Sequence, residues 1–280
     1  MKIIEAIRFS TLELEKIYSE REANNIAAIV MEETTGFNKI ERLVNKDFVL
    51  TISQEKKLNE YLKELLAHKP LQYVLGKTCF YKNQFLVNEH VLIPRPETEE
   101  LVNLIIKEQQ NKQQSIIDIG TGSGCIAISL KKNLPLTNIT AIDCSKAALN
   151  VATKNAKQLN TKITFLHLDF LDEKNWNNLD FFDIIVSNPP YIKEEEKLSM
   201  FKNVLDYEPH VALFVSDNDA LIFYRKIIEF SKKFLNPYGC IYVEINESLG
   251  LETEHLFKQN NYTTLLIKDL QGKERMLKAW

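Results

Sequence analysis

From Glu97 onward the chain alternates short apolar runs with amphipathic stretches, and this alternation restricts the fold more than any other feature. Apolar runs between helical patterns predict a mostly parallel sheet with helices on both faces. Two further runs near the C-terminus flank a loop that contains Gly272, and they predict a closing antiparallel hairpin. We therefore expect an α/β fold with a Rossmann-like, seven-stranded sheet. The runs are residues 115–119, 139–142, 163–167, 182–187, 240–245, 263–267 and 276–280.

The chain of 280 residues is longer than one compact core usually needs, and its first part has a different pattern. Apolar residues there recur at helical spacing, and they predict helices at residues 21–35 and 54–68. Short apolar runs around Asn83-Gln84 predict a β-hairpin. We expect three parts: a small helical domain at residues 1–77, a β-hairpin linker at residues 78–95 and the sheet-containing domain at residues 96–280.

A glycine-rich turn follows the first strand of the predicted sheet, where Asp118 precedes Gly120-Thr121-Gly122-Ser123-Gly124. Glycines let the backbone turn tightly and let a ligand approach it closely. A dinucleotide-binding loop has the spacing GxGxxG, but here Cys125 stands where its third glycine belongs. The spacing GxGxG instead resembles the S-adenosylmethionine loop of Rossmann-like methyltransferases.

Two later positions suit a nucleoside ligand. Asp143 ends the next strand, 19 residues after Gly124, where a carboxylate can accept hydrogen bonds from both ribose hydroxyls. Asp169 and Phe170 follow the third strand, and they offer an adenine an acceptor and a ring face. An aromatic residue after a strand more often belongs to the core, so Phe170 alone indicates less than Asp143 does.

The candidate chemistry lies in Asn188-Pro189-Pro190-Tyr191, directly after the fourth strand. The prolines fix the backbone and remove donors, so the Pro189 carbonyl and the Asn188 side-chain oxygen are acceptors for an NH2 group. Two acceptors can turn the delocalised lone pair of such a nitrogen toward a methyl group and stabilise its developing charge. We predict that Asn188, Pro189 and Tyr191 are catalytic, with the Tyr191 ring against the planar group. The motif does not choose between glutamine, adenine and cytosine.

These segments together extend over nearly the whole chain: residues 70–76, 80–87 and 93–99, the glycine loop, residues 188–191, 207–209 and 269–275. They resemble the HemK/PrmC family of protein-glutamine N5-methyltransferases. The resemblance implies transfer of a methyl group from S-adenosylmethionine to the glutamine of the Gly-Gly-Gln motif in class 1 peptide-chain release factors. It also implies that residues 1–77 recognise the release factor and that residues 188–191 receive the glutamine. The implied cofactor contacts are Gly120, Thr121, Gly122, Ser123, Gly124, Asp143, Phe170 and Asn188.

Two segments depart from the family pattern. His68-Lys69 stands where an arginine is common, and residues 214–219 replace a glycine-rich run. Both departures concern docking of the partner, since the cofactor loop is unchanged. Arg95, Glu97 and Glu208 order the cleft or contact the partner, or else they form ion pairs that brace the domain junction.

A nucleic-acid base methyltransferase is the main alternative, because the motif at Asn188 also suits an exocyclic base nitrogen. Residues 1–90 contain 13 Lys+Arg and 13 Asp+Glu, and the whole chain has a net charge of −3, so no basic surface for phosphates is indicated. A dinucleotide-dependent oxidoreductase leaves the proline motif unexplained. A silent binding module is disfavoured by the intact glycine loop and Asn188.

Other classes of site and location are not indicated. The four cysteines form no CxxC pair, so we expect neither a metal site nor disulfides. No apolar run approaches the ~20 residues of a membrane span, and the N-terminal residues lack a signal-peptide core. We therefore expect a cytoplasmic monomer that binds neither membranes nor, directly, nucleic acid.

Overall fold

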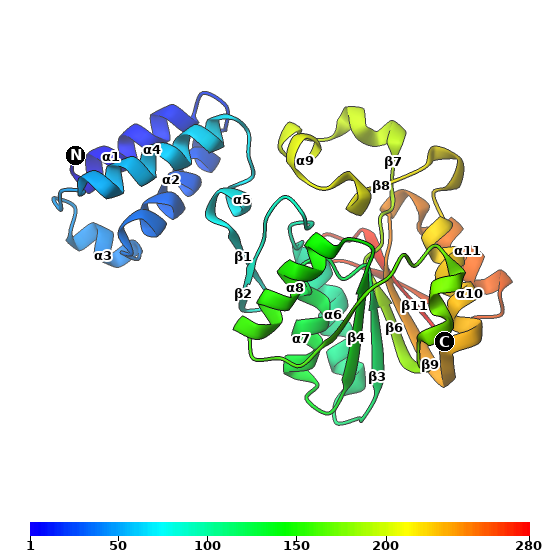
Figure 1. The fold of residues 1–280 in the computed structure, drawn as a ribbon. Coiled ribbons are helices and arrows are strands. Elements are labelled where there is room, and N and C mark those ends of the chain that lie inside the picture. The colour runs from blue at the N-terminus through cyan, green and yellow to red at the C-terminus, as the bar shows by residue number, and fades with distance from the viewer. The chain divides into compact units, whose positions relative to one another are not determined.

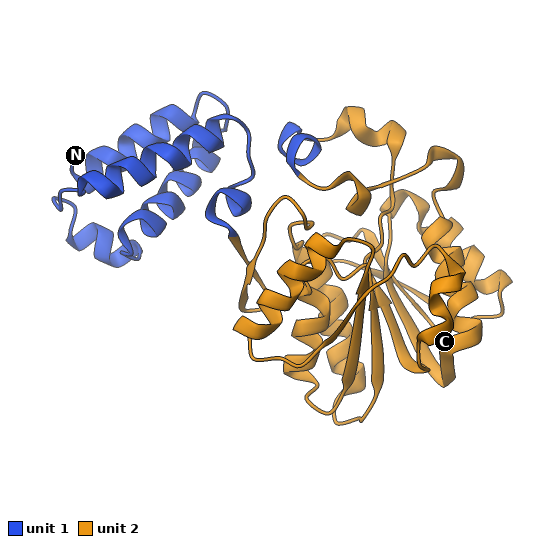
Figure 2. Cartoon of the chain, viewed as in Figure 1, with its two compact units in different colours: residues 1–76, 201–207 blue, residues 77–200, 208–280 orange.

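The computed structural model describes all 280 residues, which form two compact units. Figure 2 colours them separately: unit 1 comprises residues 1–76 and 201–207, and unit 2 comprises residues 77–200 and 208–280. Unit 1 thus takes in a short segment from within the predicted α/β region, which the sequence pattern does not reveal. The three-part division at residues 77 and 95 stays a prediction.

Unit 1 is helical, as its apolar spacing predicts. Its helices are α1 (Ile3–Leu14), α2 (Glu20–Thr35), α3 (Lys39–Val44), α4 (Ile52–Leu66), α5 (Leu71–Leu75) and α9 (Lys202–Tyr207). The core of this unit joins α1, α2 and α4 through buried side chains such as Leu14, Met31 and Leu58. Helix α4 ends two residues before the predicted end, because His68 has a left-handed backbone with φ 65°.

Unit 2 contains the predicted seven-stranded sheet (Figure 1). Its strands are β3 (Ser115–Ile119), β4 (Asn138–Asp143), β5 (Thr164–His167), β6 (Phe182–Ser187), β9 (Leu235–Glu244), β10 (Thr264–Lys268) and β11 (Glu274–Ala279). Their order is β10-β11-β9-β6-β3-β4-β5. Strands β5, β4, β3, β6 and β9 are parallel, whereas β11 is antiparallel to both β9 and β10. The α/β fold with its Rossmann-like sheet is therefore confirmed.

Both faces of the sheet are covered by helices, as Figure 1 shows. The helices are α6 (Pro96–Gln109), α7 (Cys125–Asn133), α8 (Lys146–Gln158), α10 (Ile222–Phe234) and α11 (Gly250–Gln259). Successive strand residues point to opposite faces, so Ile116 packs with α6 and α7, while Ile117 packs with α10 and α11. Burial on both faces explains why the strands are almost continuously apolar in sequence.

The predicted hairpin is formed by β1 (Lys77–Phe80) and β2 (Asn83–Leu86). Its turn lies at Tyr81 and Lys82, two residues before the position suggested by Asn83-Gln84. Both turn residues have positive φ, 44° and 61°, as a two-residue hairpin turn of this hand requires. The Asn83 side-chain amide donates to the Tyr81 carbonyl at 2.7 Å, so Asn83 supports the turn from outside it.

Strand β9 begins at Leu235 rather than at Cys240, where the apolar run starts. Its register with β6 shifts between Phe182 and Ile184, and Tyr238 has φ 66°. An irregular strand start of this kind lacks the period-two pattern, which is why the sequence did not predict it.

No helix of the chain has the length and apolar character that a membrane span requires.

Candidate active site

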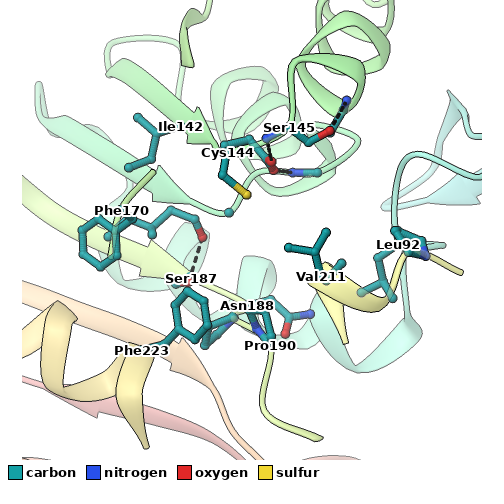
Figure 3. A pocket seen from close by; sticks show the side chains of 18 of the residues that line it. Leu92, Ile142, Cys144, Ser145, Phe170, Ser187, Asn188, Pro190, Val211 and Phe223 are labelled. Carbon is teal, nitrogen blue, oxygen red and sulfur yellow. Dashed lines mark hydrogen bonds between the residues drawn. The ribbon is translucent and has the colours of Figure 1, made fainter. Parts of the chain in front are cut away.

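The carboxyl ends of β3, β4 and β6 meet where the strand order reverses, the position at which open α/β sheets bind ligands. A cavity of about 270 Å³ lies there. Its wall combines Gly120 and Gly122 after β3, Asp143 at the end of β4, Phe170 after β5 and Asn188 after β6. Figure 3 shows Phe170 and Asn188 among the side chains that surround it. Tertiary structure therefore brings together residues that the sequence places at four separate strand ends.

The glycine loop has the backbone that its composition predicts. Gly120, Gly122 and Gly124 have φ values of 74°, 54° and 80°, which L-residues rarely adopt. At Gly120 and Gly122 an added Cβ would have no protein atom within 4 Å, so both face open space. At Gly124 it would lie 3.0 Å from Ile128 Cδ1 and 3.1 Å from the Ala152 side chain. The first two glycines leave room for a ligand, and the third lets two helices approach the loop.

The hydroxyl residues of the loop do not line the cavity. Thr121 and Ser123 are buried, and the Thr121 hydroxyl donates to Asp118 Oδ2 at 2.6 Å. Asp118 is fully buried, and its Oδ2 also accepts from the Ala127 backbone N–H at 3.2 Å, while its Oδ1 has no partner. Burial raises the pKa of Asp118 to about 7. Asp118 and Thr121 therefore stabilise the loop through a hydrogen bond on the side away from the cavity. The predicted cofactor contacts of Thr121, Ser123 and Gly124 stay predictions.

Asp143 is oriented by the backbone around it. Its Oδ2 accepts from the Gly122 N–H and its Oδ1 accepts from the Ser145 N–H, both at 2.8 Å. Each carboxylate oxygen can accept a further hydrogen bond, so the fixed carboxylate can still receive two hydroxyls. Burial raises the pKa of Asp143, and these two backbone donors oppose that rise. The carboxylate keeps acceptor capacity for a ribose, and the contact with a ribose stays a prediction.

Phe170 lines the cavity, but most of its ring belongs to the core. The ring centroid lies 5.3 Å from Trp176 and 5.5 Å from Phe230, and only 5% of the residue is exposed. The Trp176 indole N–H donates to the Phe170 carbonyl at 3.0 Å. Asp169 also lines the cavity. The ring face that we predicted for adenine is therefore largely occupied by protein, and adenine binding by Phe170 stays a prediction.

The segment Asn188 to Tyr191 begins where β6 ends, and its members face different surroundings. Asn188, Pro189 and Pro190 line the cavity, whereas Tyr191 does not. The Tyr191 hydroxyl donates to Glu244 Oε1 at 2.9 Å, and burial raises the pKa of Tyr191 well above its ordinary value. Asn188 and Pro189, from which we predicted acceptors for an NH2 group, thus line the cavity, while their acceptor role and the role of the Tyr191 ring against the substrate stay predictions.

Two residues that sequence reasoning missed support Asn188. Thr98 accepts from the Asn188 side-chain NH2 at 3.1 Å, and the Thr98 hydroxyl donates to Glu244 Oε2 at 2.6 Å. Thr98 and Glu244 are 2% and 1% exposed. Burial raises the pKa of Glu244, while the donors Thr98 and Tyr191 oppose this. The available signal was an acidic residue at the end of the apolar run of β9.

The sequence left open whether Arg95 and Glu208 order the cleft or contact the partner, or form an ion pair that braces the domain junction. Glu208 accepts from the Arg95 guanidinium at 2.5 Å and from the Ile93 backbone N–H at 3.1 Å, and only 4% of Glu208 is exposed. The segments next to this pair, residues 90–92 and 209–212, both contribute to the cavity wall. The pair therefore joins two parts of the wall, which favours the ordering role.

Residues 214–219, which depart from the family pattern, pack against the segment that follows Tyr191. Strand β8 (Phe214–Val215) pairs with β7 (Ile192–Lys193), and Asp217 Oδ1 accepts from the Glu195 N–H at 3.0 Å. Lys197 Nζ lies 4.4 Å from the centroid of the Phe214 ring. Residues 214–219 thus support a loop next to the site and are not part of the cavity wall.

No cluster of His, Cys, Asp or Glu side chains is arranged to hold a metal ion, and the four cysteines are free.

Residues 98–208 match the family described as "Methyltransferase small domain", and residues 5–76 match the "PrmC N-terminal domain". A solved methyltransferase structure from Pyrococcus furiosus shares the fold: it is 16% identical, has a TM-score of 0.53, and the match covers 78% of this chain and 95% of that one. Fold and site together define a Rossmann-like, S-adenosylmethionine-dependent methyltransferase.

Curated relatives identify the family within this class. A protein of Flavobacterium psychrophilum named "Release factor glutamine methyltransferase" is 47% identical over 95% of this chain and 94% of its own length. A protein of the same name from Bacteroides thetaiotaomicron is 41% identical over 95% of each chain. The chain belongs to the release factor glutamine methyltransferase family, which confirms the resemblance drawn from its motifs.

Proposed function

We propose that this enzyme transfers a methyl group from S-adenosylmethionine to the side-chain amide nitrogen of the glutamine in the Gly-Gly-Gln motif of class 1 peptide-chain release factors. The observation that carries the proposal is the position of Asn188 and Pro189 at the cavity beside the glycine loop. The names of the relatives support the choice of glutamine over a nucleic-acid base.

The residues at the cavity fit the cofactor. Gly120 and Gly122 expose backbone to open space, and the Asp143 carboxylate is held in place with acceptor capacity remaining. We propose that the loop from Gly120 to Gly124 holds the methionine part and that Asp143 accepts from the ribose hydroxyls. Phe170 would border the adenine with the small part of its ring that stays exposed.

Catalysis then rests on orientation and electrostatics. S-adenosylmethionine supplies, when bound, an electrophilic methyl group on a sulfonium centre. Asn188 Oδ1 and the Pro189 carbonyl accept the two hydrogens of the glutamine NH2 and direct its lone pair toward that methyl group. The nitrogen provides the electron pair of the new N–C bond, the pair of the broken S–C bond stays on sulfur, and one N–H proton leaves to solvent.

Further parts of the proposal concern the partner and the place of action. Unit 1 provides a helical surface for the release factor, and the equal numbers of basic and acidic residues in residues 1–90, 13 of each, suit a protein partner better than nucleic acid. We propose that Tyr191 packs against the planar amide and that the enzyme acts in the cytoplasm as a monomer, without direct contact to nucleic acid.

The test is methyl transfer from labelled S-adenosylmethionine to an unmethylated class 1 release factor, with duplex DNA and ribosomal RNA as parallel substrates. We expect label on the release factor alone, at the glutamine of the Gly-Gly-Gln motif by mass spectrometry. Label on nucleic acid alone would refute the assignment of the substrate. Label on another protein residue would refute the assignment of the glutamine.

A further inference from the structure

The orientation of the Asn188 side-chain amide matters for its proposed role, because the amide has an oxygen that accepts and an NH2 group that donates. Only the oxygen suits a substrate NH2. The Asn188 NH2 group donates to Thr98 Oγ1 at 3.1 Å, so the oxygen stays available for another partner. Whether this orientation is kept depends on what the Thr98 hydroxyl does, since a hydroxyl can equally donate and accept.

The Glu244 carboxylate determines whether the Thr98 hydroxyl donates to Asn188 or accepts from it. The ionised carboxylate only accepts hydrogen bonds, and its Oε2 takes the single hydroxyl proton of Thr98 at 2.6 Å. Its Oε1 takes the hydroxyl proton of Tyr191 at 2.9 Å. Thr98 therefore has only lone pairs left for Asn188, and Asn188 must present its NH2 group to Thr98. One carboxylate thus fixes the direction of a chain of hydrogen bonds.

We propose that Glu244, through Thr98, is a positioning residue that holds the Asn188 side-chain oxygen toward the substrate amide. This inference rests on the proposed function and adds two residues that act through Asn188 without touching the substrate. The same carboxylate holds the Tyr191 hydroxyl, so both ends of the Asn188 to Tyr191 segment share one anchor. Glu244 lies at the end of β9 and Thr98 in the first turn of α6, so the anchor depends on two rigid elements.

The cost of this arrangement supports a functional reason for it. Glu244 is 1% exposed, and burial raises the pKa of its carboxyl. An ionised group in such a position destabilises the folded state relative to a neutral side chain of the same shape. Arg275 on β11 offsets part of this cost, and Glu97 adds to it. A carboxylate used only for packing would be replaced by glutamine without loss.

The substitution Glu244→Gln tests the polarity. Glutamine has nearly the same shape. Because the Tyr191 phenol is a stronger donor than the Thr98 hydroxyl, the glutamine oxygen keeps Tyr191 and the glutamine NH2 group donates to Thr98, whose hydroxyl is then free to donate to the Asn188 oxygen. Asn188 would turn its NH2 group toward the substrate NH2, where two donors oppose each other. We expect kcat to fall about 100-fold, as for a misplaced catalytic group, with KM for S-adenosylmethionine changed by no more than about twofold. The melting temperature at pH 8 should equal or exceed that of the parent.

Variants at Thr98 distinguish the effect of the relay, which is the chain of hydrogen bonds from Glu244 through Thr98 to Asn188, from the effect of Thr98 packing. Thr98→Val has the same shape without the hydroxyl and should lower kcat to a similar degree, whereas Thr98→Ser should restore most of it. Glu254→Gln is the matched control, because Glu254 also accepts from a threonine hydroxyl, Thr264, at 2.9 Å and lies outside the cavity wall. Its kcat should equal that of the parent. Full activity in Glu244→Gln, or equal losses in Thr98→Ser and Thr98→Val, would overturn the proposal.

A readout without substrate distinguishes this inference from the proposed function. The Asn188 side-chain NH2 signal in the NMR spectrum can be assigned by its loss in Asn188→Ala. In the parent these protons should exchange slowly with water, and in Glu244→Gln and Thr98→Val they should exchange faster. If the parent fails to methylate the release factor, the proposed function is wrong, and the exchange rates still decide the relay. Unchanged exchange in Glu244→Gln would refute the relay whatever the substrate is.

Discussion

Three glycines with positive φ allow ligand space, packing and backbone strain to be measured separately. Gly120, Gly124 and Gly272 have φ values of 74°, 80° and 83°. Alanine at any of them costs about 1–2 kcal/mol of left-handed strain. At Gly272 and Gly120 nothing lies within 4 Å of the added Cβ, so strain is the whole cost. At Gly124 the Cβ meets Ile128 at 3.0 Å and Ala152 at 3.1 Å, which adds about 1–3 kcal/mol of overpacking.

The expected order follows from these sums. With about 3 °C of melting temperature per kcal/mol in a domain of this size, Gly272→Ala and Gly120→Ala should lower it by about 3–6 °C and Gly124→Ala by about 6–15 °C. Binding of S-adenosylmethionine, measured by calorimetry, should be unchanged in Gly272→Ala and at least about tenfold weaker in Gly120→Ala, whose methyl enters the cavity. Equal affinity of Gly120→Ala and the parent would refute the placement of the cofactor beside this loop. Equal melting temperatures of Gly120→Ala and Gly124→Ala would refute the packing argument.

Three further predictions concern the polar groups of the site. The raised pKa of Asp118, about 7 against an ordinary 3.8, means that its contribution to stability is present below pH 4 and is lost as the pH rises through 7. The loss is on the order of 4 kcal/mol, so the melting temperature of Asp118→Asn relative to the parent should rise between pH 5 and pH 8; a constant difference would contradict the buried charge. Asp143→Ala should weaken S-adenosylmethionine binding by about 100-fold in calorimetry, because two hydrogen bonds to a charged acceptor are lost, and unchanged affinity would exclude the ribose contact. Asn188→Ala should melt as the parent does but lower kcat by about 100-fold or more; activity equal to that of the parent would show that the orientation mechanism is wrong.

Most of the fold follows from local sequence pattern. Strands buried on both faces are continuous apolar runs, and residues 115–119 and 182–187 have the predicted bounds. The pattern fails where structure depends on distant contacts. Strand β9 begins five residues before its apolar run, and residues 201–207 join unit 1 although no local feature indicates this. The hairpin turn was misplaced because Tyr81 and Lys82 take positive φ without a glycine.

The site, like the fold, has features that follow from local sequence and features that depend on distant contacts. The position of Asp143 and Asn188 at the cavity could be predicted because strand ends and their spacing are visible in the sequence, and parallel strands bring such ends together. The burial of the Phe170 ring could not, since it depends on Trp176 and on Phe230 of α10. Some residues that complete the cavity wall, such as Val211 and Ala212, carry no motif of their own.

By itself, the sequence determined the α/β sheet, the glycine loop and the acceptors after β6, because each depends on backbone preferences and periodicity within a short segment. Tertiary structure alone decided which way the Asn188 side chain is held. That orientation depends on Thr98 and Glu244, which lie 90 residues before Asn188 and 56 residues after it. Neighbours in space set the direction of a hydrogen bond, and a linear sequence does not record which neighbours will be buried together.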